Sequence, residues 1–164
     1  MPEPITIKER IERRLLEIVA VIDGVSAAER WDARGNTKRN RSVVLVPGDE
    51  QAEEGGSANS GTTEKKLTLE FHTLVAQGAD DSEVTASALN RWLGRIALAV
   101  LADPLLTDPD TGERLAIDVR EVASLPAPVD SEQPEAYSIL VIEVLYAHHR
   151  DNPYTAPWIA QKEV

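Results

Sequence analysis

Three histidines, His72, His148 and His149, are the side chains best suited to acid–base or metal chemistry in this sequence of 164 residues. His148 and His149 are adjacent in a segment predicted as a strand, so their side chains face opposite ways and cannot chelate one ion together. His72 could share a face with one of them, but zinc needs three or four ligands. The sequence has no cysteine, which excludes disulfides, thiolate nucleophiles and cysteine-bound metals. We therefore predict no metal site.

The segment from Asp108 to Gly112 reads DPDTG, which is similar to the beginning of a calcium-binding loop. It lacks the further oxygen ligands and the closing Glu of an EF-hand, so we expect an Asx/Pro turn. Gly55-Gly56 is not followed by the Lys-Ser or Lys-Thr of a phosphate-binding loop, and no G-x-S-x-G motif is present. We predict no catalytic residue, no cofactor and no enzymatic activity; a hydrolase using His72 and neighbouring carboxylates is the enzymatic alternative.

The net charge of −11 is unevenly distributed along the chain. Residues 1–41 carry a net charge of +2, and the remaining residues carry −13. Such an acidic surface repels DNA and anionic lipid. No apolar run approaches the length that spans a bilayer, and the N-terminal sequence MPEPITIKERIERR is charged where a signal peptide is apolar. We expect a soluble protein made in a cytoplasm, without a membrane partner.

Hydrophobic periodicity predicts two helices. In the first, Thr6 to Ile22, Thr6 and Glu9 have the spacing of a capping box, and Gly24 ends the helix. Its apolar stripe consists of Ile7, Ile11, Leu15, Ile18 and Ile22. The second helix, Ser82 to Ala102, has a wider stripe and ends before Pro104.

Five strands are predicted around these helices: Ala28–Arg34, Ser42–Val46, Lys65–Ala76, Leu115–Leu125 and Tyr137–His148. The first two are expected to be joined as a hairpin across Arg34–Arg41. The last strand is apolar on both faces, which is typical of a central strand. We predict an α+β fold with a five-stranded, mostly antiparallel sheet and two helices packed on it. Residues 1–155 form the single domain, and residues 156–164 form a C-terminal tail.

A long acidic segment, Pro47 to Glu64, separates the second and third predicted strands. It contains five acids, four glycines and no large apolar residue, so we expect a mobile loop that contributes little to the core. Its acids and the basic cluster before the second strand are candidate channel or partner contacts: Asp49, Glu50, Glu53, Glu54, Lys38, Arg39 and Arg41. For the basic cluster, a solvated turn between strands is the favoured interpretation.

The residues from Tyr146 to Tyr154 read YAHHRDNPY and resemble the end of the closing strand in bacteriophage tail terminator proteins, also called tail completion or minor tail protein U-like proteins. Members typically end in an apolar strand, then a tyrosine and a basic residue, then a tail with Asp and Pro. The N-terminal helix followed by Gly24-Val25, and the second helix followed by a strand pair, are similar as well. The resemblance is one of pattern and covers about residues 5–155.

The resemblance implies a non-enzymatic ring, usually a hexamer, that caps the tail tube, ends its polymerisation and provides the surface to which the head docks. The implied partners are further copies of the chain, the tail tube protein, the head–tail connector or stopper protein and the tape-measure protein, with DNA passing through unbound. The implied location is the tail or neck of the virion, after assembly in the host cytoplasm. The candidate C-terminal interface consists of Tyr146, His148, Arg150 and Tyr154.

A ring needs two different patches that meet, and a mildly basic N-terminal third could meet an acidic remainder. The same charge could instead serve only solubility. Two other functions stay open. One is another neck, tail-tube or head–tail connector component; the other, from a different class, is a small ligand-binding regulatory α+β module.

Overall fold

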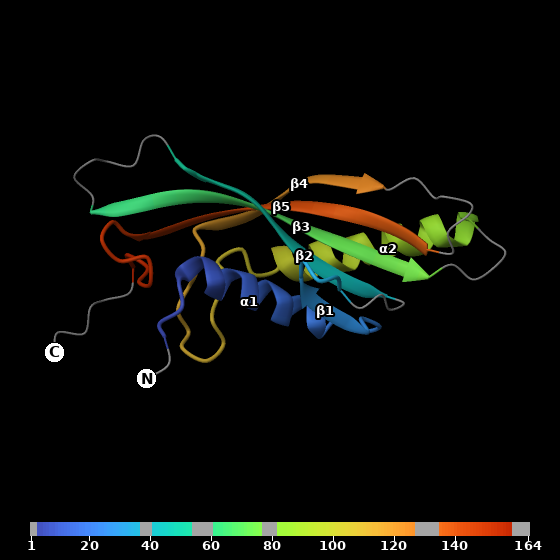
Figure 1. Cartoon of the computed structure of the whole chain (residues 1–164), viewed down its shortest axis with the longest axis horizontal. Helices are drawn as coiled ribbons and strands as arrows, with labels where there is room; N and C mark the ends of the chain where they lie inside the picture. The colour runs from blue at the N-terminus through green and yellow to red at the C-terminus, as the bar shows by residue number, and fades with distance from the viewer. Residues whose placement is uncertain (1–2, 37–40, 54–60, 77–81, 127–134, 159–164) are drawn as a thin grey trace.

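The computed structural model describes residues 3–36, 41–53, 61–76, 82–126 and 135–158, and its strands form one mixed sheet in the order β1-β2-β3-β5-β4 (Figure 1). The strands are β1 (Ala27–Arg30), β2 (Ser42–Ala52), β3 (Thr62–Ala76), β4 (Asp118–Pro126) and β5 (Glu135–His149). The helices are α1 (Ile7–Ala20) and α2 (Ser82–Leu101). The predicted α+β class, with a mostly antiparallel five-stranded sheet and two helices, is confirmed.

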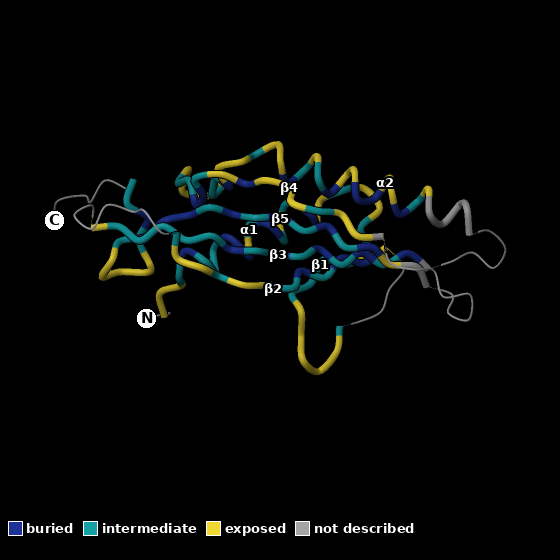
Figure 2. The backbone as a smooth tube through the Cα atoms, turned by 90° about the horizontal axis from the view of Figure 1, so that it is seen from above, coloured by how far each residue is buried: buried dark blue, intermediate teal, exposed yellow. Residues whose placement is uncertain are grey.

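Both helices pack on the same face of the sheet. Along the strands, residues that are buried under the helices alternate with residues that are only half-buried. The buried residues form one core with the helices. The core contains Val43, Leu45, Leu67, Leu69, Phe71, Leu140, Ile142 and Val144 from the sheet, and Ile7, Ile11, Leu15, Val19, Leu93, Ile96 and Val100 from the helices. Figure 2 shows the buried stretches of β3 and β5 along the middle of the molecule, whereas much of β4 is exposed. The second face of the sheet carries neither helix.

Helix α1 begins as the sequence predicts. The side-chain oxygen of Thr6 accepts a 3.2 Å hydrogen bond from the backbone N–H of Glu9, which is half of a capping box. The carboxylate of Glu9 does not complete the box, because it pairs with Arg13 and Arg30. The helix ends at Ala20, one residue before its C-cap.

The predicted hairpin between the first two strands is wrong. Strand β1 pairs with β2 in parallel, from Ala27 opposite Ser42 to Arg30 opposite Leu45. The strand also ends at Arg30 rather than Arg34, because Asn36 folds back on it: the Asn36 side chain donates to the Arg30 carbonyl at 2.7 Å and accepts from the Asp32 N–H at 3.1 Å. The chain must therefore travel back along β1 before β2 starts.

The predicted acidic loop is strand at both of its ends. Strand β2 continues through Pro47 and Gly48 to Ala52, and β3 already begins at Thr62. A bulge between Pro47 and Glu50 shifts the register with β3. Gly48 permits the bulge, because a Cβ there would lie 2.9 Å from the Thr68 carbonyl oxygen. Only residues 54–60 of this segment, with Glu54 among them, lie outside the described part of the chain.

The C-terminal boundary also differs from the prediction, because residues 156–158 belong to the domain. Ala156 is completely buried in the core. The Arg114 guanidinium lies over the Trp158 ring, 4.2 Å from the ring centroid. The indole N–H of Trp158 donates a hydrogen bond of 2.6 Å to the Arg114 carbonyl. The chain thus returns to the body of the molecule after β5.

Candidate partner-binding surfaces

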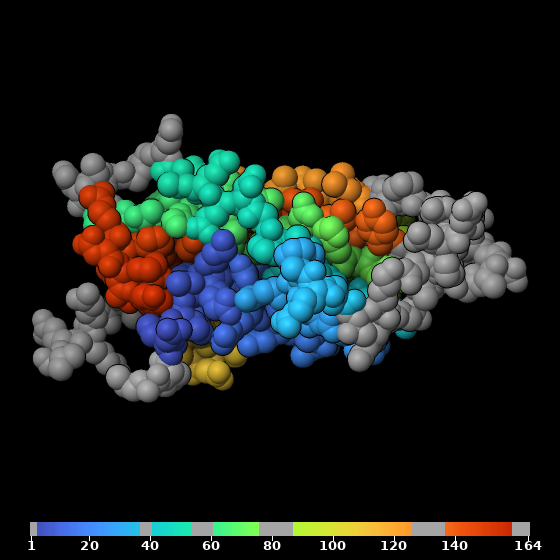
Figure 3. All heavy atoms as spheres, viewed as in Figure 1, coloured from blue at the N-terminus to red at the C-terminus, as the bar shows by residue number. Residues whose placement is uncertain are grey.

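The end of β2 and the start of β3 form a hairpin arm, which we define as residues 48–53 and 61–66. Strand β5 extends the arm to three strands, with Thr62 opposite His149 and Lys66 opposite Leu145. The arm and the C-terminal segment lie at the same end of the molecule (Figures 1 and 3). The acidic segment of the sequence is therefore held at one end of the long axis by a regular ladder.

Glu50 fixes the base of the arm to α1. Its carboxylate pairs with the Lys8 ammonium at 2.7 Å and with the Lys65 ammonium at 2.5 Å, and it accepts a 3.2 Å hydrogen bond from the Tyr146 hydroxyl. Burial by itself would raise the pKa of Glu50, but hydrogen bonds from Lys65 and Lys8 outweigh it and lower the pKa to about 2. Glu50 is thus an internal ion-pair partner, which corrects its assignment as a channel or partner contact.

A second set of ion pairs ties α1 to β1. Arg30 contacts Glu9 and Glu12, each at 3.0 Å. Glu12 is 5% exposed, and burial raises its pKa despite the charges of Arg30 and Lys8. These pairs hold the N-terminal helix against the sheet edge.

The DPDTG segment forms the turn that the sequence predicts. One carboxylate oxygen of Asp108 accepts from the backbone N–H groups of Asp110 and Thr111, at 2.9 and 3.2 Å. The other oxygen pairs with Arg10 at 2.9 Å, and this hydrogen bond lowers the pKa of Asp108. The carboxylate thus closes a turn and anchors it to α1.

Of the predicted C-terminal interface, two members are not accessible. Tyr146 is 2% exposed and His148 is 8% exposed; burial and the nearby charge of Glu50 raise the pKa of the Tyr146 hydroxyl, which stays protonated and donates. Arg150 and Tyr154 are exposed. Only the latter two can contact a partner directly.

The remaining predicted contacts are divided between the arm and the start of β2. Asp49 is exposed on the arm, and Glu53, at the end of the β2 part of the arm, pairs with Lys66 at 3.1 Å. Lys38 and Arg39 lie outside the described residues. Arg41 is exposed and has a left-handed backbone, with φ of 59°.

Arg41 contributes to a pocket of about 340 Å³ that sequence reasoning missed. We call it the arginine pocket. Its other basic residues are Arg91 and Arg95 of α2, and Asp23 and Trp92 also line it. The Arg95 guanidinium lies 5.7 Å from the centroid of the Trp92 ring. Arg91 and Arg95 are four residues apart in α2, so the sequence could have predicted that they share one helix face. No sequence pattern predicts that Arg41 lies beside them.

The second face of the sheet forms an open apolar surface. Leu125 and Tyr137 on this face are about half exposed, at 51% and 45%. A pocket of about 260 Å³ on this face is lined by residues that include Val44, Leu74, Tyr137 and His72. We call this surface the open sheet face.

The open sheet face also holds the residues of the enzymatic alternative. His72 Nε2 lies 2.7 Å from a carboxylate oxygen of Glu70. No hydroxyl group in the described part of the chain hydrogen-bonds to His72. The pair joins two neighbouring positions on one face of β3.

Searches against protein-family models and against curated proteins returned no match for the chain. Within the residues that the structure describes, no three His, Asp or Glu side chains are grouped so that they could hold a metal ion. In the same residues, no helix has the length and apolar character needed to cross a membrane.

Proposed function

We propose that the chain is a structural subunit that assembles into a homo-oligomeric ring, of the kind formed by the phage tail terminator proteins that its sequence pattern resembles. The open sheet face carries this proposal. Both helices cover one face, while the other exposes Leu125 and Tyr137 to about half of their surface. An exposed apolar patch of this kind is typical of a protein–protein interface.

In this proposal the ring ends the polymerisation of a tail tube and receives the head. The tail tube protein lies on one side of the ring and the connector or stopper protein on the other. The net charge of −11 per subunit supports this role, because an acidic channel lets DNA pass without binding it. Another component of the neck or tail tube would use the same ring and the same interface.

Negative-stain electron microscopy of the purified chain tests the proposal. We expect rings of one diameter. Lysines introduced together at Leu125 and Tyr137 should abolish the rings and preserve the fold, because both side chains are already about half exposed. Leu98→Lys is the matched control, since Leu98 is 74% exposed on α2, on the side away from the sheet. Single particles of monomer size for the unmodified chain would refute the proposal.

A further inference from the structure

The three basic residues of the arginine pocket have no carboxylate partner among the residues that the structure describes. Six other arginines form ion pairs with acids: Arg10, Arg13, Arg14, Arg30, Arg34 and Arg120. Arg114 lies over the Trp158 ring instead. Among the described residues, no ion pair joins Arg41, Arg91 or Arg95 to a carboxylate. Arg91 and Arg95 donate instead to backbone carbonyls, at 3.3 and 3.4 Å. Among the described residues, the pocket therefore brings together three guanidinium groups that have no carboxylate partner.

The local backbone is shaped to hold these groups together. Arg41 adopts a φ of 59°, which is uncommon for a residue with a Cβ and costs energy. Gly24 has a φ of +89°, and a Cβ there would lie 3.3 Å from both the Arg41 guanidinium and the Trp92 ring. Asp23 supplies one negative charge against three positive ones. Guanidinium groups arranged in this way bind carboxylates, often in bidentate pairs.

Strand β2 separates this pocket from the acidic arm of the same chain. Arg41 directly precedes the strand, and Glu53 directly follows it. Eleven residues at about 3.3 Å each place the two ends roughly 35 Å apart. In Figure 1 the arm lies at the left end of the molecule, and the start of β2 and α2 lie in the right half. The arm of one chain therefore cannot reach its own arginine pocket.

We propose that the arginine pocket binds the hairpin arm of a second copy of the chain, with Asp49 and Glu53 of one subunit pairing with Arg41, Arg91 and Arg95 of the next. Complementary charge favours this occupant, since the arm exposes Asp49 and part of Glu53. The contact joins two different patches, and repetition of such a contact closes a ring. The inference rests on the proposed ring and identifies one of its subunit contacts.

A charge exchange between two variant chains tests this contact. One chain carries Arg91→Glu and Arg95→Glu, and the other carries Asp49→Lys and Glu53→Lys. Each chain alone should place like charges at every contact, which raises the concentration needed for assembly by roughly tenfold or more. In an equimolar mixture every arm meets a pocket of opposite charge, so rings with alternating subunits should return. The readout is light-scattering mass at matched ionic strength.

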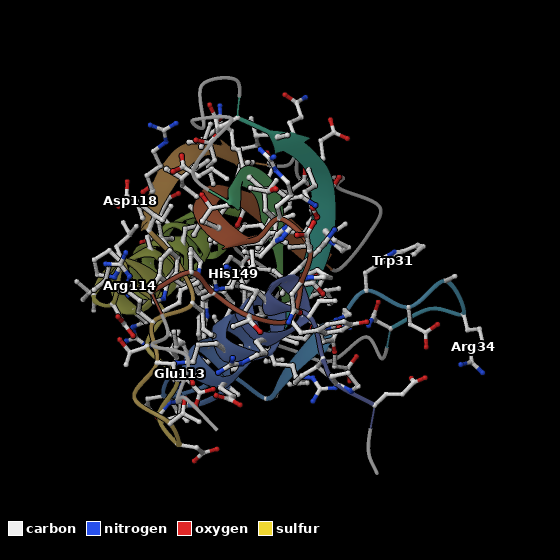
Figure 4. All side chains as sticks on the ribbon, turned by 90° about the vertical axis from the view of Figure 1, so that its left-hand side faces the viewer. Trp31, Arg34, Glu113, Arg114, Asp118 and His149 are labelled. Carbon is white, nitrogen blue, oxygen red and sulfur yellow. The ribbon has the colours of Figure 1, made fainter. Side chains whose placement is uncertain are left out.

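Two controls separate this contact from general effects. Arg34→Glu makes the same charge change on a side chain that is 93% exposed and that projects on a loop away from the body of the molecule (Figure 4); it should leave assembly unchanged. Arg91→Glu alone guards against misfolding, because Arg91 is exposed and its guanidinium donates to the Ser87 carbonyl of the same helix. It should fold normally and still weaken assembly.

The outcomes distinguish this inference from the ring itself. If the unmodified chain forms rings and the Arg91→Glu, Arg95→Glu chain forms them equally well, the pocket contact is wrong and the ring stands. If the pocket variant fails but the Asp49→Lys, Glu53→Lys chain still assembles, the arm is not the occupant. If the unmodified chain is a monomer, both proposals fail. Recovery only on mixing supports the contact.

Discussion

The Tyr146 hydroxyl donates a hydrogen bond of 3.2 Å to the Glu50 carboxylate, and so connects β5 with β2 across the strand between them. Lys8 and Lys65 pair with the same carboxylate, which brings α1 into the contact. The apolar core ends here, and a polar cluster continues the same face of the sheet toward the arm. This cluster sets the direction in which the arm leaves the body of the molecule.

Removing the charge of Glu50 should reduce stability in an acid-dependent way. The folded-state pKa is about 2, below the ordinary value of 4.5, so the stabilisation is complete above about pH 4.5 and is lost as the pH falls toward 2. Glu50→Gln should lower the free energy of unfolding at pH 7 by roughly 1–3 kcal/mol and flatten this acid dependence. Urea titrations from pH 7 to pH 2.5 measure both effects. Glu53→Gln is the matched control, and an equal loss in both variants would contradict the account.

A charge inside the α1 stripe should unfold much of the protein. Ile11 and Leu15 are completely buried, so Ile11→Asp or Leu15→Asp places an unpaired carboxylate in the core. The expected cost is about 3 kcal/mol or more. Arg13→Asp, at an exposed position of the same helix, should cost less than about 1 kcal/mol. Thermal unfolding monitored by circular dichroism compares them; melting temperatures within a degree or two of each other would show that the stripe is not core.

Replacement of the acidic segment should have effects that depend on where the replacement starts. Composition alone leads to the expectation that replacing Asp49–Thr63 by a short Gly/Ser linker changes stability by no more than about 1 kcal/mol. The structure reverses this expectation, because the replacement removes Glu50 and the ladder at the ends of β2 and β3. We expect a loss of several kcal/mol, whereas replacing residues 54–60 alone should cost about 1 kcal/mol or less. Equal stabilities of the two variants in urea would count against this assignment.

The C-terminal segment should contribute measurably to stability. Trp158 packs on the Arg114 guanidinium and donates a hydrogen bond to its carbonyl. Trp158→Ala should therefore cost roughly 1–3 kcal/mol, while Tyr154→Ala, at a side chain 43% exposed, should cost less than about 1 kcal/mol. Differential scanning calorimetry gives both values. A silent Trp158→Ala would mean that the domain ends earlier.

The parts of the fold that sequence reasoning predicted are those with a strong local period. The Ile7, Ile11 and Leu15 positions recur at the helical spacing, and all three are fully buried in α1. In β3, Leu67, Leu69 and Phe71 point to the core, while Thr68 and Glu70 between them are only half-buried. In both cases one buried face determines the pattern, so the local sequence carries the information.

The parts that it missed depend on long-range pairing. Pro47 and Gly48 are typical of loops, yet a bulge accommodates them within β2. Gly35-Asn36 predicts a hairpin, but Asn36 caps the end of β1 and the chain doubles back to form a parallel pair. The arginine pocket combines Arg41 with a helix fifty residues later in the chain, which no local pattern reveals.

Native mass spectrometry of the unmodified chain in a volatile buffer tests the ring most directly, because it counts subunits. The account predicts one discrete species whose mass is a fixed multiple of 17.9 kDa, with six copies as the expected number. It should dissociate into monomers when Leu125 and Tyr137 are both replaced by lysine. A spectrum that contains only the 17.9 kDa chain, at concentrations up to the limit of the method, would contradict the central claim.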